Sequence, residues 1–288
     1  MSWGARHLSV ELGGHRVLDD LSLDVAPGRI VGLVGGDGAG KSTALRSLVG
    51  LVRVSAGLVE MPARHRLGYM PASSGSYPDL TVDENLAFVA AAYGLGASTA
   101  HERADRLLER AGLVDARSRL GGQLSGGMRQ KLGVIMAMLH EPDVLVLDEP
   151  TTGVDPVSRA ELWRLITRAA ADGAAVGFST TYLDEASRAA ELYVLEAGRV
   201  LASGSPAGIV AATPGTLWSV RERPHGESST RSWRRGREWR LWQPARGEPG
   251  MPPGEAEGER VEPDLQDAVI VAALAHRAES SSPSQGAA

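Results

Sequence analysis

The sequence predicts an α/β fold in which a mostly parallel sheet is covered by helices on both faces. Two observations lead to this prediction. Short apolar segments typical of buried strands alternate with segments of helical periodicity along most of the chain. A glycine-rich loop also stands between one such strand, residues 30–34, and the helix that follows it. The length of 288 residues allows one sizeable domain of this kind and a small appendage.

The first part of the chain, residues 6–34, alternates apolar and polar residues around Gly13-Gly14 and predicts two strands with a tight turn before the buried strand. The other elements are predicted from apolar runs for strands and from helical spacing for helices. In chain order they are a helix over 42–49, strands over 57–61 and 67–70, helices within 81–113 with a break at 94–98, a helix over 126–139, a strand over 144–147, a helix over 156–171 with proline in its first turn, a strand over 174–179, a helix over 182–190, and two strands over 192–200 that turn at Ala197-Gly198.

Changes in composition predict five segments. The main domain is expected over residues 1–212. Residues 213–243 hold four of the six tryptophans and predict a β-like segment, while 244–262 is rich in Pro, Gly and Glu and predicts a flexible linker. Residues 263–278 regain helical spacing and predict a C-terminal helix, and 279–288 is expected to be a disordered tail.

The composition excludes several classes of protein. The chain has no cysteine, so disulfide scaffolds, thiolate metal sites and cysteine nucleophiles are ruled out. The net charge of −5 argues against a protein dominated by binding to nucleic-acid phosphates. The sequence shows neither a signal-peptide layout nor an apolar stretch near the ~18 residues of a membrane span, which predicts a soluble, cytoplasmic protein.

The glycine-rich loop fits the pattern G-x-x-x-x-G-K-[ST]. Its residues are Gly35, Gly36, Asp37, Gly38, Ala39, Gly40, Lys41 and Ser42, followed by Thr43. Such a loop lets backbone N–H groups and a helix N-terminus converge on phosphate oxygens. Lys41 is expected to neutralise the β- and γ-phosphates, and the Ser42 hydroxyl to bind Mg²⁺. The alternative is a simple strand-to-helix turn, but one of only two lysines stands where the motif requires it.

A second candidate site is the end of the apolar strand 144–147, which is followed by two carboxylates. Asp148 is expected to assist in binding Mg²⁺, and Glu149 to act as the base that polarises an attacking water. An acidic strand end is often only a solvated terminus, so the phosphate loop is what favours the catalytic interpretation.

A third motif places a serine and two glycines at the start of the predicted helix 126–139. Such a segment is usually a helix cap, although a hydroxyl and free N–H groups there also suit an anion. Its residues are Leu124, Ser125, Gly126, Gly127 and Met128.

Together, these motifs and Thr152-Gly153-Val154-Asp155-Pro156 resemble the nucleotide-binding domain of ABC ATPases, most closely the ABC-2 and drug-exporter branch. The resemblance covers about residues 5–210 and implies a P-loop NTPase fold with a RecA-like parallel core, an antiparallel β subdomain and a helical signature subdomain. It further implies a cytoplasmic ATPase at the inner face of the membrane that binds ATP and Mg²⁺. Two such domains would then sandwich ATP, with Ser125 and its neighbours facing the partner's nucleotide and Asp155 crossing the interface. A separate ABC-2-type permease is the other expected partner.

The chain departs from this family at three positions. Leu12 stands about where an aromatic residue usually stacks on adenine, and Trp3 or His15 is left as a possible substitute. Ala72 follows Met70-Pro71 where a glutamine is expected, and Thr181 replaces the switch histidine that contacts the γ-phosphate.

These departures predict a slow site on this chain's own phosphate loop and an intact signature segment that completes a partner's site. An asymmetric heterodimer is therefore expected, with a homodimer as the alternative. Asp37, Thr181 and Tyr182 are also similar to the first ATPase domain of ribosome-associated ATPase/transporter fusions.

Two further hypotheses remain open at this stage. The first is a soluble ATPase that binds the ribosome or RNA through the arginines and tryptophans of residues 216–242. A solvated hairpin is the simpler interpretation of that segment. The second is a regulatory subunit that binds ATP without hydrolysing it. The intact Glu149 argues against this second hypothesis.

Overall fold

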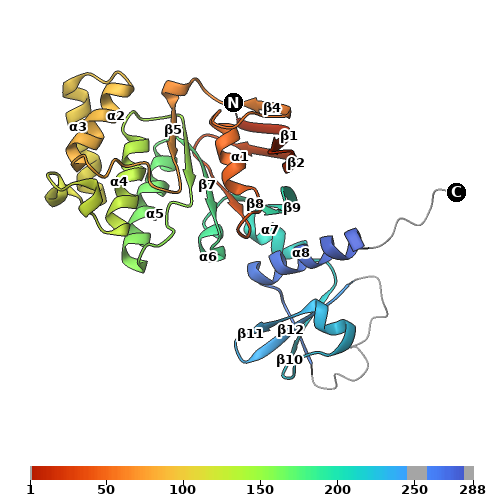
Figure 1. Ribbon diagram of the computed structural model, residues 1–288. Helices are drawn as coiled ribbons and strands as arrows, with labels where there is room; N and C mark the ends of the chain where they lie inside the picture. Colours follow the sequence, from red (N-terminus) through yellow and green to blue (C-terminus); the bar gives the residue numbers. More distant parts are fainter. Residues whose placement is uncertain (1, 245–257, 282–288) are drawn as a thin grey trace. The chain divides into compact units, whose positions relative to one another are not determined.

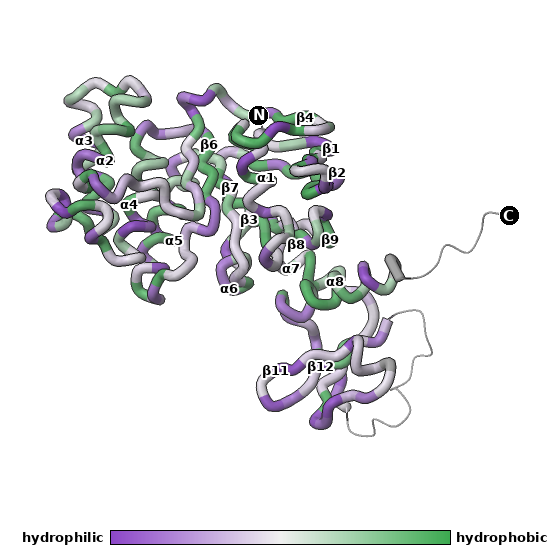
Figure 2. The backbone as a smooth tube through the Cα atoms, in the orientation of Figure 1, coloured by the Kyte–Doolittle hydropathy of each residue, from purple (hydrophilic) through white to green (hydrophobic). Residues whose placement is uncertain are grey.

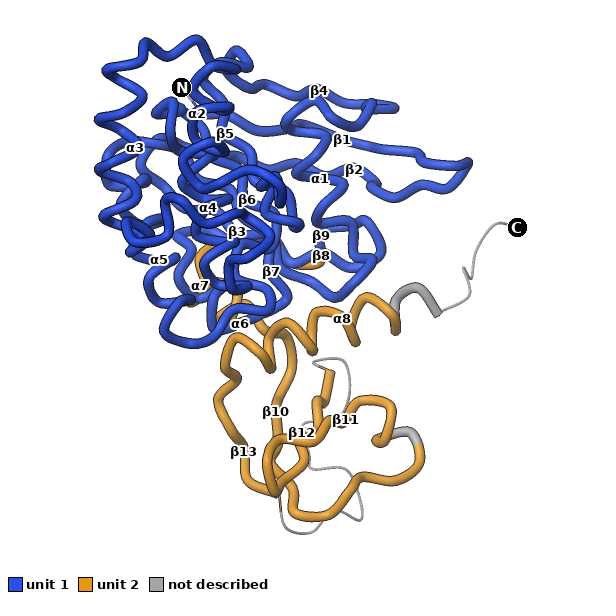
Figure 3. The backbone as a smooth tube through the Cα atoms, turned by 60° about the vertical axis from the view of Figure 1, so that its left-hand side comes forward, with its two compact units in different colours: residues 1–200 blue, residues 201–288 orange. Residues whose placement is uncertain are grey.

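A computed structural model describes residues 2–244 and 258–281 of the chain. These residues form two compact units, one up to residue 200 and the other from residue 201 (Figure 3). Residues 245–257, most of the predicted linker, and 282–288 of the predicted tail lie outside the described residues. No described helix is both long enough and apolar enough to cross a bilayer.

The core of the first unit is a six-stranded sheet whose strands are parallel from β5 to β8. In spatial order its strands are β5 (Leu67–Met70), β6 (Val144–Asp148), β7 (Ala175–Thr180), β3 (Ile30–Val34), β8 (Glu191–Glu196) and β9 (Arg199–Gly204). The register sets Asp148 beside Ser179 and Val34 beside Thr180. The carboxyl ends of β3, β6 and β7 therefore meet at one edge of the sheet, where the connecting loops can share a site.

Helices cover both faces of this sheet, as expected when βαβ connections bury strands on either side. Figure 1 shows α4 and α5 on one side and α1 on the other, and β6 is hydrophobic up to its last residue, Asp148 (Figure 2). The helices of the first unit are α1 (Lys41–Leu48), α2 (Val82–Ala92), α3 (Ala97–Ala111), α4 (Gly126–Met138), α5 (Pro156–Ala171) and α6 (Leu183–Ala186), with 3₁₀ turns at Arg64–Arg66, Val114–Ala116 and Gly121–Gln123. Lys131 of α4 forms an ion pair with Glu161 of α5, which joins the two helices.

An antiparallel three-stranded sheet packs beside the parallel core. Its strands, in the order β2 (His15–Val25), β1 (Trp3–Leu12) and β4 (Ala56–Glu60), turn at Gly13-Gly14 between the first two. Leu8, Leu18 and Leu21 from this sheet share one hydrophobic cluster with Leu45 of α1 and Val146 of β6. The loop that joins β3 to α1 is thus held between two sheets.

The second unit contains a four-stranded antiparallel sheet and two helices. Its elements are α7 (Pro206–Ala211), β10 (Thr216–Val220), a 3₁₀ turn (Gly226–Arg231), β11 (Ser232–Arg235), β12 (Glu238–Gln243), β13 (Glu259–Val261) and α8 (Leu265–Ser281), with the strands in the order β11-β12-β10-β13. Leu217, Trp242 and Val271 form its small buried core.

Most of the elements predicted from the sequence are found in the structure, and three segments differ. The helix expected over 182–190 ends at Ala186, because Ala190 already donates its N–H to Ile30 O and the chain must enter β8. The segment 244–262, expected to be a linker, contains β13, which pairs along the free edge of β10. The C-terminal helix, expected over 263–278, begins at Leu265 and runs to Ser281, so residues 279–281 of the expected disordered tail are helical.

Candidate functional site

The glycine-rich loop leads from β3 directly into α1. Gly35 cannot carry a side chain, because a Cβ there would lie 2.3 Å from Leu195 O. Gly38 and Gly40 have φ of 76° and 103°, the left-handed region that glycine adopts without strain. Gly40 is the N-cap of α1 and provides no capping side chain, and the first turn holds no acidic residue. The first N–H groups of α1 are therefore without a side-chain acceptor, which suits an anionic ligand.

Lys41 is enclosed by this loop and is only 4% exposed. Its Nζ donates hydrogen bonds to the backbone oxygens of Gly35 at 2.9 Å and Gly36 at 3.0 Å, and lies 3.6 Å from Glu149 Oε1. The ammonium group is thus held inside the loop, where it adds positive charge to that of the helix N-terminus.

Asp148, the last residue of β6, meets the loop although the two lie far apart in the sequence. Its Oδ1 accepts hydrogen bonds from Ser42 Oγ at 2.9 Å and from Ser179 Oγ at 2.7 Å. The carboxylate is fully buried, and its Oδ2 has no hydrogen-bond partner. A buried carboxylate oxygen of this kind is costly unless a ligand or cation satisfies it.

This arrangement fits a hard divalent cation. Mg²⁺ typically takes one or two protein oxygens together with phosphate oxygens and water, so it needs few protein ligands. Ser42 and Asp148 supply that number of oxygens beside the phosphate loop. No group of three or more His, Asp or Glu side chains suited to a metal occurs among the described residues, here or elsewhere.

Glu149 lies next to Asp148 and has a strained backbone with φ of 49°. Its N–H donates to Ser179 Oγ at 2.9 Å, and its Oε2 accepts from Thr152 Oγ1 at 3.0 Å. A non-glycine residue keeps such a backbone conformation only where its surroundings impose it, and these residues cluster at functional sites. The strain and the two hydrogen bonds aim the carboxylate toward Lys41 rather than toward solvent.

The signature segment, residues 124–128, and the loop before α5 each lead into the N-terminus of a helix. Ser125 is the N-cap of α4 and accepts a hydrogen bond from Met128 N, while Asp155 caps α5 by accepting from Val157 N and Ser158 N. These backbone hydrogen bonds lower the pKa of the Asp155 carboxyl, and the bond from Ser158 N–H has the larger effect. Both residues are exposed and keep free lone pairs or a hydroxyl proton for a neighbouring molecule.

The position expected to contact adenine is occupied by an exposed aliphatic side chain. Leu12 ends β1 and pairs with His15 across the turn, whereas Trp3 pairs with Val25 at the other end of the same strand. Nine residue steps of about 3.3 Å separate Trp3 from Leu12, or roughly 30 Å. Trp3 therefore cannot replace Leu12 here, while His15 lies directly opposite it.

Ala72 and Thr181, the two substituted positions, are both exposed. Ala72 helps to line a hollow of about 350 Å³ together with Gln130 of α4 and Thr152 of the loop after Glu149. Gln130 Oε1 is buried and has no hydrogen-bond partner. A methyl group at position 72 can supply none, so the side chains by which the loop after β5 can form hydrogen bonds in this hollow are the hydroxyls of Ser73 and Ser74, not an amide.

A buried carboxylate that no sequence pattern singles out joins two parts of the site. Glu185 is 1% exposed and accepts from Thr151 Oγ1 at 2.5 and 2.6 Å and from Thr180 Oγ1 at 3.0 Å, with Arg159 Nε at 3.4 Å. Thr151 follows Glu149 by two residues, and Thr180 precedes Thr181. The acidic side chain therefore fixes these two segments to each other. A single charged residue in the helix predicted over 182–190 gives no sign of such a contact.

Comparison with known proteins assigns the first unit. The family model described as "ABC transporter" matches residues 18–152. The chain is 40% identical over 215 residues to the Escherichia coli (strain K12) "Probable multidrug ABC transporter ATP-binding protein YbhF", a match that covers 71% of this chain and 37% of that protein. It is 37% identical over 216 residues to the "Nod factor export ATP-binding protein I" of Burkholderia lata, covering 71% of each chain. The chain thus spans well under half the length of the first relative.

Solved structures give the same assignment. A protein described as "ATP binding subunit of ABC transporter" superimposes with a TM-score of 0.68 at 31% identity, over 73% of this chain and 92% of that one. The cbiO1 protein of Clostridium perfringens, described as part of the ABC transporter complex cbiONQ, superimposes with a TM-score of 0.64 over 73% of this chain and 90% of that one. Its identity of 23% supports the fold alone.

Proposed function

Since the chain belongs to the ABC transporter family of ATP-binding proteins, we propose that it is the ATPase subunit of an ABC-2-type exporter. ATP binding and hydrolysis at residues 35–42 would energise a separate permease at the inner face of the cell membrane. Export is supported by the names of the relatives in Escherichia coli and Burkholderia lata.

One observation carries the catalytic part of this proposal. Ser42 and Asp148 are 106 positions apart in the sequence, yet the Ser42 hydroxyl donates to Asp148 Oδ1 and leaves a buried, unsatisfied oxygen beside it. Fold stability alone gives no reason to keep an unpartnered carboxylate oxygen at the end of a fully buried strand. A Mg²⁺ ion bound with ATP would satisfy that oxygen.

The residues of the site then have distinct roles. Backbone N–H groups of the loop and of the first turn of α1, with the Lys41 ammonium, hold the β- and γ-phosphates. Ser42 and Asp148 would hold Mg²⁺, which neutralises phosphate charge when bound. Glu149 orients the attacking water and accepts its proton, a role that typically contributes ~10²–10⁴ in rate. Leu12 gives the adenine an apolar contact without a π-face.

The two substitutions predict that this chain hydrolyses ATP slowly by itself. Ala72 and Thr181 offer neither the amide nor the imidazole that would position the water and the γ-phosphate. The residues offered to a partner's nucleotide, Ser125 with Gly126 and Gly127 and then Asp155, remain in place at helix N-termini. We therefore propose a heterodimer in which this chain completes the more active site of a second ATPase subunit.

The test compares the isolated chain with its complex. The isolated chain should bind Mg-ATP and hydrolyse it slowly, and a second ABC subunit with glutamine and histidine at the two positions should raise the rate strongly. In that complex Ser125→Glu of this chain should abolish turnover, because a carboxylate would face the partner's triphosphate, while Glu149→Gln should reduce it less. Rapid hydrolysis by the isolated chain that Glu149→Gln eliminates would contradict the asymmetric arrangement.

The arginines and tryptophans of residues 216–242 are mostly engaged within the second unit. The indole N–H groups of Trp218, Trp233 and Trp242 donate to Gln243, Asp267 and Pro214 O. The remaining tryptophan, Trp239, lies under the guanidinium of Arg223 at 5.4 Å. Arg235 pairs with Asp264. These contacts favour the interpretation of the segment as a structural hairpin over the RNA-binding hypothesis.

A further inference from the structure

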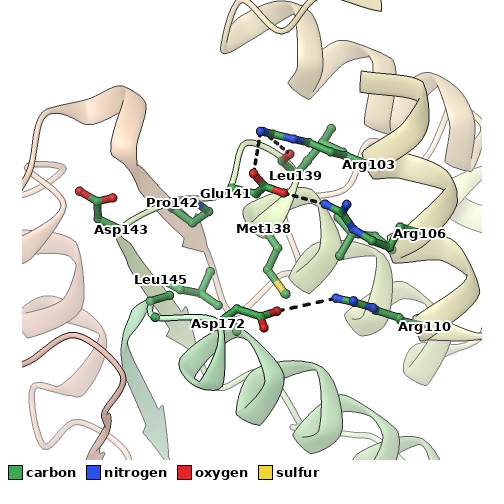
Figure 4. A pocket seen from close by; sticks show the side chains of 14 residues that line it. Arg103, Arg106, Arg110, Met138, Leu139, Glu141, Pro142, Asp143, Leu145 and Asp172 are labelled. Atoms are coloured by element: carbon green, nitrogen blue, oxygen red, sulfur yellow. Dashed lines mark hydrogen bonds and ion pairs between the residues drawn. The ribbon is translucent and has the colours of Figure 1, made fainter. Parts of the chain in front are cut away.

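A pocket of about 550 Å³ lies in the first unit where α3 approaches the opposite end of β6 from Asp148. Its walls come from α3, from the turn between α4 and β6, and from the end of α5 (Figure 4). Leu107, Met138, Leu145 and Ala169 give it an apolar lining. A volume of this size is within the range of small-molecule sites. The lining of this pocket is more polar than apolar, because charged side chains share it with these apolar ones.

Three arginines stand in a row along the wall formed by α3. Arg103, Arg106 and Arg110 are spaced i, i+3 and i+7, so they lie on one face of the helix and repel one another. Arg103 and Arg106 both pair with Glu141, at 2.6 Å each. Glu141 has φ of 54°, a conformation that costs energy for a residue with a side chain, and its carboxylate alone serves two guanidiniums.

Arg110 is the least satisfied of the three. Its nearest carboxylate oxygen, on Asp172, is 3.9 Å away, and Asp172 is held more closely by Arg168 at 3.0 Å. The remaining carboxylate of the pocket, Asp143, is held by Arg66 at 2.6 Å. Three arginines and three carboxylates thus line this pocket, and two of the carboxylates are also paired with arginines outside the lining, Arg66 and Arg168. Arg106 and Arg110 face the pocket one helical turn apart (Figure 4).

We propose that this pocket binds a small molecule with an apolar body and one anionic head group, a carboxylate, sulfonate or phosphate. The head group pairs with Arg106 and Arg110, whose i, i+4 spacing places two guanidiniums on one anion and relieves their mutual repulsion. The apolar body lies against Leu107 and Leu145 and displaces the flexible Met138 side chain, which Figure 4 shows between Leu145 and the arginine row. The site is independent of the phosphate loop and of the proposed ATPase activity.

The experiment titrates the purified full chain with two fluorescent probes that differ only in charge. The anionic probe is 1-anilinonaphthalene-8-sulfonate, and its neutral counterpart is N-phenyl-1-naphthylamine, which lacks the sulfonate. The wild-type chain should bind the anionic probe at one saturable site. Arg110→Gln should weaken that binding at least fivefold, because one of two charge-assisted contacts is lost, and should change the affinity for the neutral probe less than twofold.

Two further variants make the result decisive. Arg119→Gln removes an exposed arginine outside the pocket and should leave both affinities within twofold of wild type. Met138→Trp fills the pocket and should weaken both probes, and unchanged urea midpoints for the arginine variants would show that they fold normally. The proposal is overturned if Arg110→Gln binds the anionic probe as the wild type does, or if it loses the neutral probe to the same extent. No nucleotide is used, so neither outcome bears on ATP hydrolysis.

Discussion

Ser179 is the residue whose replacement tests most sharply how the two carboxylates at the end of β6 are held. Its hydroxyl donates to Asp148 Oδ1 at 2.7 Å and accepts from Glu149 N at 2.9 Å, and the side chain is fully buried. Ser179→Ala removes both bonds in a place that water does not reach. One bond involves a carboxylate, and the other leaves a backbone N–H unsatisfied.

The expected destabilisation follows from these two losses. A hydrogen bond to a charged group contributes about 1.5–3 kcal/mol, and an unsatisfied buried N–H costs about 1–3 kcal/mol. Asp148 keeps the Ser42 bond, so the total should lie in the lower half of the combined range, at about 3–4 kcal/mol. For a unit of this size that corresponds to a fall in Tm of roughly 6–16 °C.

The assay is urea and thermal unfolding of Ser179→Ala beside a matched control. Ser47 is also buried, but its hydroxyl donates only to the carbonyl of Thr43 within α1, so Ser47→Ala should change the stability by less than about 1 kcal/mol. If the two variants lose equal stability, the bridging role of Ser179 is wrong. Ser179→Thr, which restores a hydroxyl, should recover part of the stability and of any ATPase activity.

Two further predictions concern buried titratable groups. Burial lowers the pKa of His140 to about 4, although its Nε2 donates to Leu67 O, so the unfolded chain takes up a proton near pH 6.5 before the folded chain does. Stability should therefore fall by up to about 3 kcal/mol as the pH drops from 6.5 to 4, and urea midpoints at pH 7 and pH 4.5 should show a smaller fall for His140→Phe than for wild type; an equal fall would refute this. Glu185→Gln should destabilise the first unit by about 3–5 kcal/mol, because Arg159 loses its buried partner, whereas replacing the exposed Asp184 by Asn should have little effect in the same unfolding assay.

The sequence predicted the elements that bear the phosphate loop and the acidic strand end, because each is defined by local pattern. A run of apolar residues before Gly35 and another before Asp148 predict buried strands, and parallel strands bring their carboxyl ends to one edge. The sequence therefore assigned Ser42 and Asp148 to the same Mg²⁺ site, whereas the hydrogen bond between the two side chains is seen in the structure.

Other features of the site depend on partners that no local pattern reveals. In the sequence, Ser179 is an ordinary strand residue. Its hydrogen bonds with Asp148 and with the N–H of Glu149 arise only because the sheet register places it beside Asp148. Glu185 belongs to a segment predicted as a longer helix, where a charged residue is expected to face solvent. β13 pairs with β10 over a separation of about forty residues, which composition cannot indicate.

The measurement that tests the central claim most directly is the calorimetric titration of ATP into the isolated chain, with and without Mg²⁺. Wild type should bind ATP at one site, and Mg²⁺ should strengthen binding about tenfold or more; Lys41→Ala should weaken binding in both conditions, and Asp148→Asn should remove most of the Mg²⁺ effect. The control is Asp143→Asn, at the opposite end of the same strand and paired with Arg66, which should titrate like wild type. ATP binding that is unaffected by Lys41→Ala, or a Mg²⁺ effect that survives Asp148→Asn intact, would place the nucleotide elsewhere and contradict the account.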